Sequence, residues 1–277
     1  MATFTGPVFV PNPVQLTDRY GLFTVATGPL TLPTIARGGG IQYETGTCEL
    51  PNSLEVECGP TTEKVLTVDY GVDTVVGTPF IVYSSLVCGL AGMSEQRMRT
   101  FLMERLKSGE QAVVENVFST QAVDQSPGLS DNPGVVTVTA VTTGVTDSVA
   151  VLEEAFYNTY GLVGTLHIPH LLAQRLQEGG GLRWDGRVWR TAAGSAVSFG
   201  NYAGNEPDGD APAAGLSWIY MTGQVTIWRT PDSDVFITPF ENSFSRTTNQ
   251  LTAVAEREYV LTIDCAVYAT AVTVEPA

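Results

Sequence analysis

The chain has 277 residues, of which 43% are hydrophobic and 16% charged, so it can bury a core without covalent support. Its 29 acidic residues outnumber 14 Lys and Arg, which gives a formal net charge of −15. Because phosphate neutralisation needs a basic face, this balance excludes a dedicated nucleic-acid binder. No stretch approaches the ~20 apolar residues of a membrane helix, and Met1–Phe4 do not open a secretory signal, so we expect a cytosol-like compartment and no membrane contact.

Residues 1–40 are rich in proline and glycine and carry only short apolar pieces. This composition predicts an extended arm that builds no core of its own and lies on a neighbouring subunit. Residues 41–77 predict a long hairpin, because Leu54–Cys58 and Lys64–Asp69 lean toward alternation and Gly59–Thr62 supplies a turn. Its faces are half polar, so we expect it to project from the subunit.

The clearest predicted helix covers residues 94–120, after an apolar strand or buried connector at 79–90. Ser94 is a good N-cap. Apolar residues recur at helical spacing along it: Met98, Leu102, Leu106, Val113 and Val117. The helix would be ~40 Å long, and Gly109 marks a possible bend.

A loop is expected at 121–134 and a Val/Thr-rich stretch at 135–146. Then Asp147 or Ser148 caps a predicted helix at Val149–Tyr160, which Gly161 ends. A core strand at Gly164–Pro169 and a helix at His170–Glu178 follow, and the chain closes with long strands at Ala253–Ile263 and Ala266–Val274. This mixture predicts an α+β or α/β fold.

Candidate chemistry is sparse. The pair His167-x-x-His170 has unsuitable spacing for a metal site, and His167 is expected at the edge of the core. The acidic stretch Asn205–Asp210 lacks the ladder of a calcium loop and is expected to be solvated. The runs Gly38–Gly40 and Gly179–Gly181 match no phosphate-binding loop, and no G-x-S-x-G motif is present. We therefore expect no catalytic, cofactor or metal site, and no enzyme.

The cysteines Cys48, Cys58, Cys88 and Cys265 show no C-x-x-C spacing. We expect free, buried thiols. The alternative is a Cys48–Cys58 bond across the hairpin.

The order of these parts, with four local stretches, resembles the Hong Kong 97-like fold of tailed-bacteriophage major capsid proteins, which encapsulins share. One stretch, Arg105–Glu115, is similar to the spine helix of small actinobacterial phage structural proteins. Two others, Leu152–Ala155 through Gly164–Pro169 and Thr191–Val197, resemble strands and a helix of the A-domain. The last, Asn249–Gln250 with Ala255–Arg257 and Asp264–Tyr268, resembles the end of the P-domain strands.

The resemblance implies a division into four parts. Residues 1–40 form the N-arm and residues 41–77 the E-loop hairpin. The P-domain takes residues 78–134 and 250–277, with the spine helix at 94–120, and the A-domain takes residues 135–249. The loop 200–214 is then expected near the symmetry axes.

The resemblance also implies a function: a major capsid protein whose hexamers and pentamers close an icosahedral shell around double-stranded DNA, without sequence-specific binding. The chain would reside in the virion and assemble in the host bacterial cytoplasm, with scaffold, portal and decoration proteins as further partners. Alternatives are an encapsulin-like shell, a tail or neck structural protein, and a small acidic hydrolase or carbohydrate-binding protein. The last would use the aromatics Trp184, Trp189, Tyr202 and Trp218.

Overall fold

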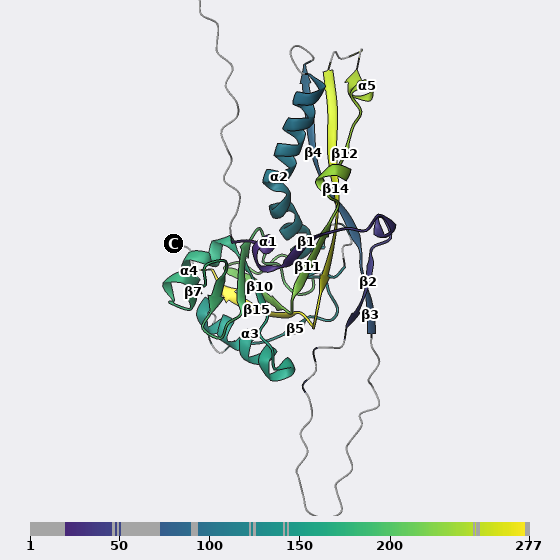
Figure 1. Cartoon of the computed structure of the whole chain (residues 1–277). Coiled ribbons are helices and arrows are strands. Elements are labelled where there is room, and N and C mark those ends of the chain that lie inside the picture. Colours follow the sequence, from purple (N-terminus) through teal and green to yellow (C-terminus); the bar gives the residue numbers. More distant parts are fainter. Residues whose placement is uncertain are drawn as a thin grey trace, which may run out of the picture.

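The computed structural model shows a column of one long helix and several strands that rises from a body of shorter elements (Figure 1). It describes residues 20–45, 48, 50, 73–89, 94–121, 123, 126–140, 142, 144–245, 247 and 250–274. The column contains α2, β4, β12 and β14, while α3, α4 and most short strands lie in the body (Figure 1). None of the described helices combines the length and apolarity that crossing a membrane requires.

Helix α2 (Glu95–Thr120) confirms the predicted long helix, and the Ser94 side chain caps it by accepting a hydrogen bond from the Arg97 amide. Its buried face differs from the prediction in one place. Val114 is fully buried and Val113 is 44% exposed, because the face continues from Leu106 through Glu110.

Strand β14 (Gln250–Ile263) organises a six-stranded sheet. The predicted strand at 79–90 is β4 (Pro79–Gly89), which runs antiparallel to β14 along its whole length. The other members are β1 (Thr27–Thr31), β11 (Val225–Arg229), β12 (Phe236–Ile237) and β13 (Phe244–Ser245). Helix α2 packs on one face of this sheet.

The body contains a seven-stranded sheet in the order β5-β15-β10-β6-β9-β8-β7. Its strands are β5 (Val136–Thr137), β6 (Thr165–Pro169), β7 (Leu182–Trp184), β8 (Trp189–Thr191), β9 (Ala196–Gly200), β10 (Leu216–Thr222) and β15 (Tyr268–Thr273). Helices α3 (Val145–Tyr160) and α4 (His170–Glu178) pack on it. The predicted core strand is confirmed by β6, in which every residue is buried.

The remaining elements are short. They are α1 (Leu22–Val25), the 3₁₀ turns η1 (Thr34–Ala36) and η2 (Asp232–Asp234), α5 (Phe240–Ser243), and the two-stranded pair β2 (Ile41–Thr45) with β3 (Asp73–Gly77).

Three observations differ from the sequence expectations. Helix α3 begins at Val145 after Gly144, so neither Asp147 nor Ser148 is its cap; the Ser148 hydroxyl instead donates to the Ala271 carbonyl. The two closing strands separate, because β14 joins the sheet of β4 while β15 pairs with β10. Strands β11 and β12, although they fall within residues 135–249, pair with β14.

A further difference concerns the arm. Its described part, from residue 20, packs on its own subunit: Leu22 and Leu32 are 0% and 1% exposed. The buried carboxylate of Glu115 accepts the Leu22 amide at 2.7 Å and the Asn201 amide at 2.8 Å. Gly200 is required here, since a Cβ at this position would lie 2.6 Å from the Glu115 carboxyl carbon. Glu115 therefore ties the N-terminal segment and the end of β9 to α2.

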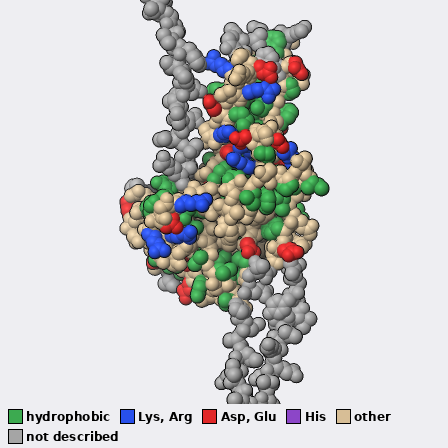
Figure 2. Space-filling view, viewed as in Figure 1, with side chains coloured by type: hydrophobic (Ala, Val, Ile, Leu, Met, Phe, Trp, Pro, Cys, Tyr) green, Lys and Arg blue, Asp and Glu red, His purple; other side chains and the backbone are tan. Residues whose placement is uncertain are grey.

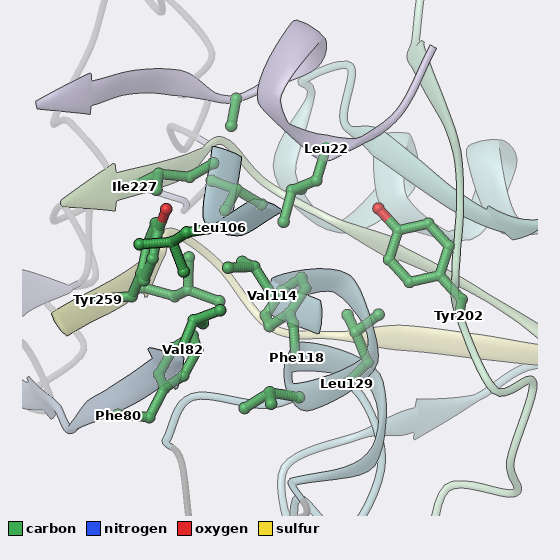
Figure 3. Close-up of a cluster of buried hydrophobic side chains, with 14 of the residues drawn as sticks. Leu22, Phe80, Val82, Leu106, Val114, Phe118, Leu129, Tyr202, Ile227 and Tyr259 are labelled. Carbon is green, nitrogen blue, oxygen red and sulfur yellow. The ribbon is translucent and has the colours of Figure 1, made fainter. Parts of the chain in front are cut away.

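The main core fills the space between α2 and the six-stranded sheet, and Figure 3 shows it drawing on segments far apart in sequence. Leu22, Phe118 and Tyr202 come from the N-terminal segment, α2 and the loop after β9. A second cluster lies between α3, α4 and the seven-stranded sheet, centred on Leu152, Phe156 and Ile168.

Candidate assembly surfaces

Strand β4 buries one side and exposes the other. Phe80 and Val82 are 5% and 2% exposed beneath α2. Their neighbours on the opposite face, Ile81, Tyr83 and Val87, are 58%, 67% and 60% exposed. This is the alternation of a half-buried strand, but the outward positions carry large apolar side chains instead of polar ones.

Strand β12 extends this apolar face. Tyr83 pairs with Glu256 of β14, and Glu256 pairs in turn with Phe236, which is 55% exposed. Paired residues of antiparallel strands share a face. We call Ile81, Tyr83, Val87 and Phe236 the outer strip. Among the described residues β4 pairs only with β14, so the strip borders an unpaired strand edge, the kind of surface at which another chain adds.

The turn η1 presents Ile35, which is 95% exposed, and the chain just after it is bonded to Glu258, the cross-strand partner of Ile81 in the outer strip. Two contacts hold this turn: Arg37 pairs with Asp234 at 2.5 Å, and the Gly38 amide donates to Glu258 at 2.6 Å. A fixed turn with a fully exposed isoleucine adds to the apolar surface on this side of the molecule.

The β2–β3 pair is where the chain enters and leaves the stretch 46–72. Tyr43 of β2 accepts a hydrogen bond from the Ile263 amide, which fixes the pair to the end of β14. The predicted hairpin strands Leu54–Cys58 and Lys64–Asp69 lie outside the described residues, and only the antiparallel pairing of β2 with β3 bears on them.

The cysteine expectations are wrong for one pair, since Cys48 and Cys265 form a disulfide bond with their Cα atoms 5.5 Å apart. The two residues are separated by 217 positions, so no local pattern could indicate the pairing. Asp264 brings a carboxylate to within 4.8 Å of both sulfurs. Among the described residues this is the one group of three potential metal ligands, and the bond occupies both of its sulfurs.

The β7–β8 hairpin carries basic and aromatic side chains at the edge of the body. Arg183 is exposed next to Trp184, which is 46% exposed and packs edge-on against Trp189 with ring centroids 5.4 Å apart. Figure 2 shows basic side chains gathered where β7 and α4 lie. A cleft of about 480 Å³ beside the hairpin is lined in part by Asp185, Arg187 and Arg190.

Hydrogen bonds order the turn of this hairpin. Bonds from the Val188 amide, from the Arg190 side chain and from the Arg187 amide lower the pKa of Asp185 to about 2. These hydrogen bonds hold the turn that carries Arg187 and Arg190 in one conformation.

The acidic loop after β9 lies against the chain that follows α2. The Asp131 amide donates to the Pro207 carbonyl at 2.9 Å, and Tyr220 donates to the Asn205 carbonyl at 2.6 Å. The Glu206 and Asp208 side chains accept backbone amides within the loop. Asp208 and Asp210 are exposed and Glu206 is half-buried, so most of the loop's charge is at the surface.

His167 is fully buried, not at the core edge as expected. The Thr222 hydroxyl donates to the Gly223 carbonyl, so it accepts from His167 Nε2–H at 2.9 Å. His167 Nδ1 is then the acceptor for the Tyr202 hydroxyl at 3.2 Å. Burial lowers the pKa of His167 to about 3. The imidazole is a neutral structural bridge between β6, β10 and the loop after β9.

His170, at the start of α4, is exposed, so the two histidines lie in different environments. Of the aromatics considered for sugar binding, Tyr202 is 5% exposed and packs in the core. The glycines Gly179–Gly181 follow the carboxyl end of α4, which is the wrong helix end for holding a phosphate.

No family model matches the chain, and no curated protein matches it in sequence. Solved structures match over nearly its full length. The capsid of the native GTA particle matches with a TM-score of 0.61 and 12% identity, over 98% of this chain and 96% of that one. The capsid of Ralstonia phage GP4 matches with a TM-score of 0.55 and 9% identity, over 99% of this chain and 96% of that one. The holo-SrpI encapsulin complex from Synechococcus elongatus matches with a TM-score of 0.55 and 11% identity, over 98% of this chain and 94% of that one.

Identity this low establishes the fold alone, but the coverage leaves no large part of the chain outside it. The order of parts expected from the sequence agrees with these elements. The long helix α2 lies beside β4 and β14, the body contains the seven-stranded sheet, and β2 pairs with β3. The chain has the α+β, Hong Kong 97-like capsid fold.

Proposed function

We propose that the chain is the major capsid protein of a tailed double-stranded DNA bacteriophage, forming the hexamers and pentamers of an icosahedral shell. The observation that carries this proposal is the outer strip on the unpaired edge of β4. A single copy leaves Ile81, Tyr83 and Phe236 more than half exposed. Closed assemblies of one chain bury such surfaces by repeating one contact. The fold shared with capsid subunits over the whole chain supports the same function.

In this proposal the genome is enclosed without base recognition. The net charge of −15 disfavours tight binding of phosphates, and the described basic residues of α2 are engaged locally. Arg99 pairs with Glu95, Arg105 donates to the Ser85 carbonyl, and Lys107 pairs with Asp232. Repulsion between an acidic shell wall and the DNA phosphates prevents the wall from binding the packaged genome tightly.

The remaining functional assignments belong to the proposal. The division into N-arm (1–40), E-loop (41–77), P-domain (78–134 and 250–277) and A-domain (135–249) follows the resemblance. Scaffold, portal and decoration proteins are the proposed further partners, the virion is the proposed location, and assembly takes place in the host cytoplasm. We assign no catalytic, cofactor or metal site, and no enzymatic activity.

The experiment is to purify the full chain, with and without its phage's scaffold protein, and to follow it by light scattering and electron microscopy. We expect closed shells with five-fold and six-fold capsomers. A monomer that persists at high concentration with scaffold present would overturn the proposal, and open rings or tubes would favour the tail or neck alternative.

A second candidate is an encapsulin-like shell, which the match to the Synechococcus elongatus encapsulin favours. A phage capsid and an encapsulin shell differ in what they enclose. Particles purified from the native source should contain DNA if the chain is a phage capsid protein. A stoichiometric enclosed enzyme and no DNA would favour the encapsulin.

A further inference from the structure

The Cys48–Cys265 bond joins the chain just after β2 to the turn between β14 and β15. Cys48 follows β2 closely, at the point where the chain enters the stretch 46–72. Cys265 occupies the turn between β14 and β15 with φ 64°, a left-handed conformation uncommon outside glycine. The bond therefore connects a segment expected to contact other subunits with the interior architecture of its own subunit.

The turn around Cys265 is held in place independently of the disulfide. Tyr43 accepts the Ile263 amide at 3.4 Å, and Tyr160 accepts the Ala266 amide at 3.2 Å. The Gly223 amide also donates to the Asp264 carbonyl at 3.2 Å. Opening the bond would leave this turn fixed, so its effect would fall on the Cys48 side, at the start of the chain that leads on to β3.

The two sulfurs differ in access. Cys48 is 5% exposed, whereas Cys265 is half-buried. The Asp264 carboxylate lies within 4.8 Å of both sulfurs, and its negative charge opposes a second negative charge on either one. Because the thiolate is the reactive form, we expect this carboxylate to slow formation of the bond.

We propose that Cys48 and Cys265 are a redox-controlled tie. The pair is a dithiol while the chain assembles in a reducing compartment. On exposure to a low-molecular-weight disulfide the bond forms and attaches the chain just after β2 to the turn between β14 and β15. Asp264 sets the rate of closure. The consequence for shells rests on the function proposed above, whereas the chemistry belongs to the single subunit.

The reaction is thiol–disulfide exchange with a disulfide of the glutathione class. The more accessible Cys265 thiolate attacks one sulfur of the small disulfide, whose S–S bond breaks and releases one thiolate. The Cys48 thiolate then attacks the Cys265 sulfur of the mixed disulfide and releases the second. Two electrons pass from the protein to the small disulfide, and the two protein thiol protons go to the released thiolates.

The test uses the full chain in reduced and oxidised glutathione buffers, with peptide mass spectrometry and limited proteolysis. We expect a Cys48–Cys265 linked peptide under oxidising conditions, and cleavage between residues 46 and 72 at least tenfold slower than in the reduced protein. Cys48→Ser should abolish both effects, and Cys88→Ser should leave both unchanged. Asp264→Asn should accelerate closure about threefold, as expected when ~10-fold more thiolate is offset by lower nucleophilicity.

A second readout separates this inference from the proposed function. Oxidised shells should withstand low salt that dissociates reduced shells, and Cys48→Ser shells should be insensitive to oxidation. Absence of the linked peptide, or equal proteolysis in both buffers, would overturn the tie whether or not shells form. A subunit that forms the bond but never assembles would leave the tie standing and overturn the capsid function.

Discussion

Glu110 of α2 and Arg257 of β14 form an ion pair inside the column. The Arg257 side chain is 0% exposed and that of Glu110 is 6% exposed. Glu110 also accepts Arg229 of β11 at 2.7 Å, and Arg257 also donates to Asp232, which pairs with Lys107 of α2. One buried carboxylate thus links the long helix to two strands of the six-stranded sheet.

Replacing this carboxylate should destabilise the subunit strongly. Glu110→Ala leaves the buried Arg257 charge without its main partner, and such a loss costs about 3–5 kcal/mol. We expect a clear fall in the urea midpoint of unfolding. Glu104→Ala, an exposed position on the same helix, is the matched control and should stay within about 0.5 kcal/mol. Equal midpoints for the two variants would contradict a stabilising role for the pair.

His167 should make stability pH-dependent. Its pKa is lowered to about 3 in the folded chain by burial, from an ordinary value of 6.5, so the unfolded chain binds the proton first. Stability from the neutral ring is therefore present above pH 6.5 and is lost as the pH falls toward 3. The slope contributed is at most about 1.4 kcal/mol per pH unit.

The measurement is urea unfolding between pH 7 and pH 4 for wild type and His167→Gln. The variant should be less stable at pH 7 and should show a shallower decline in acid. His170→Gln, at an exposed position, should keep the wild-type slope. A His167→Gln slope equal to wild type would show that another group carries the dependence.

The outer strip should control assembly and not folding. In the double variant Ile81→Thr/Tyr83→Thr the β-branched residues keep the strand preference but remove apolar area, which is worth roughly 1.5–3 kcal/mol for each side chain buried in a contact. We expect an unchanged circular dichroism spectrum and a critical concentration for assembly raised at least tenfold. Tyr83→Phe keeps the apolar area and should assemble normally. Normal assembly of the double variant would remove the strip from the interface.

Deleting residues 50–68 and joining the ends with a short Gly-Ser link should separate folding from shell formation. The β2–β3 pair and Cys48 remain, and the buried core residues Leu152, Phe156 and Ile168 are untouched. We expect a soluble, folded subunit that forms no stable shells. Calorimetry and electron microscopy of this variant against wild type check both points. A deletion variant that unfolds, or that still builds normal particles, would contradict an intersubunit role for the hairpin.

Local elements could be predicted wherever a short window carries the signal. Ser94 and the apolar spacing of Met98, Leu102 and Leu106 sufficed for α2, and His170–Glu178 has the bounds expected for its helix. The start of α3 was missed because Gly144 supplies no side-chain cap. Alternation could not tell the exposed positions of β4 from the buried ones, because the exposed side of this strand is as apolar as the buried side.

The amino-acid sequence alone determined the mixture of helices and strands, the order of the parts and the lack of a recognisable catalytic motif, because these depend on local periodicity, turn residues and spacing. Tertiary structure decided which distant residues meet. It buried Leu22 against Glu115, placed the Arg257 charge beside Glu110, and joined Cys48 to Cys265 across 217 positions. Each of these contacts depends on how sheets and helices pack, and a partner far along the chain leaves no periodic trace near the residue it contacts.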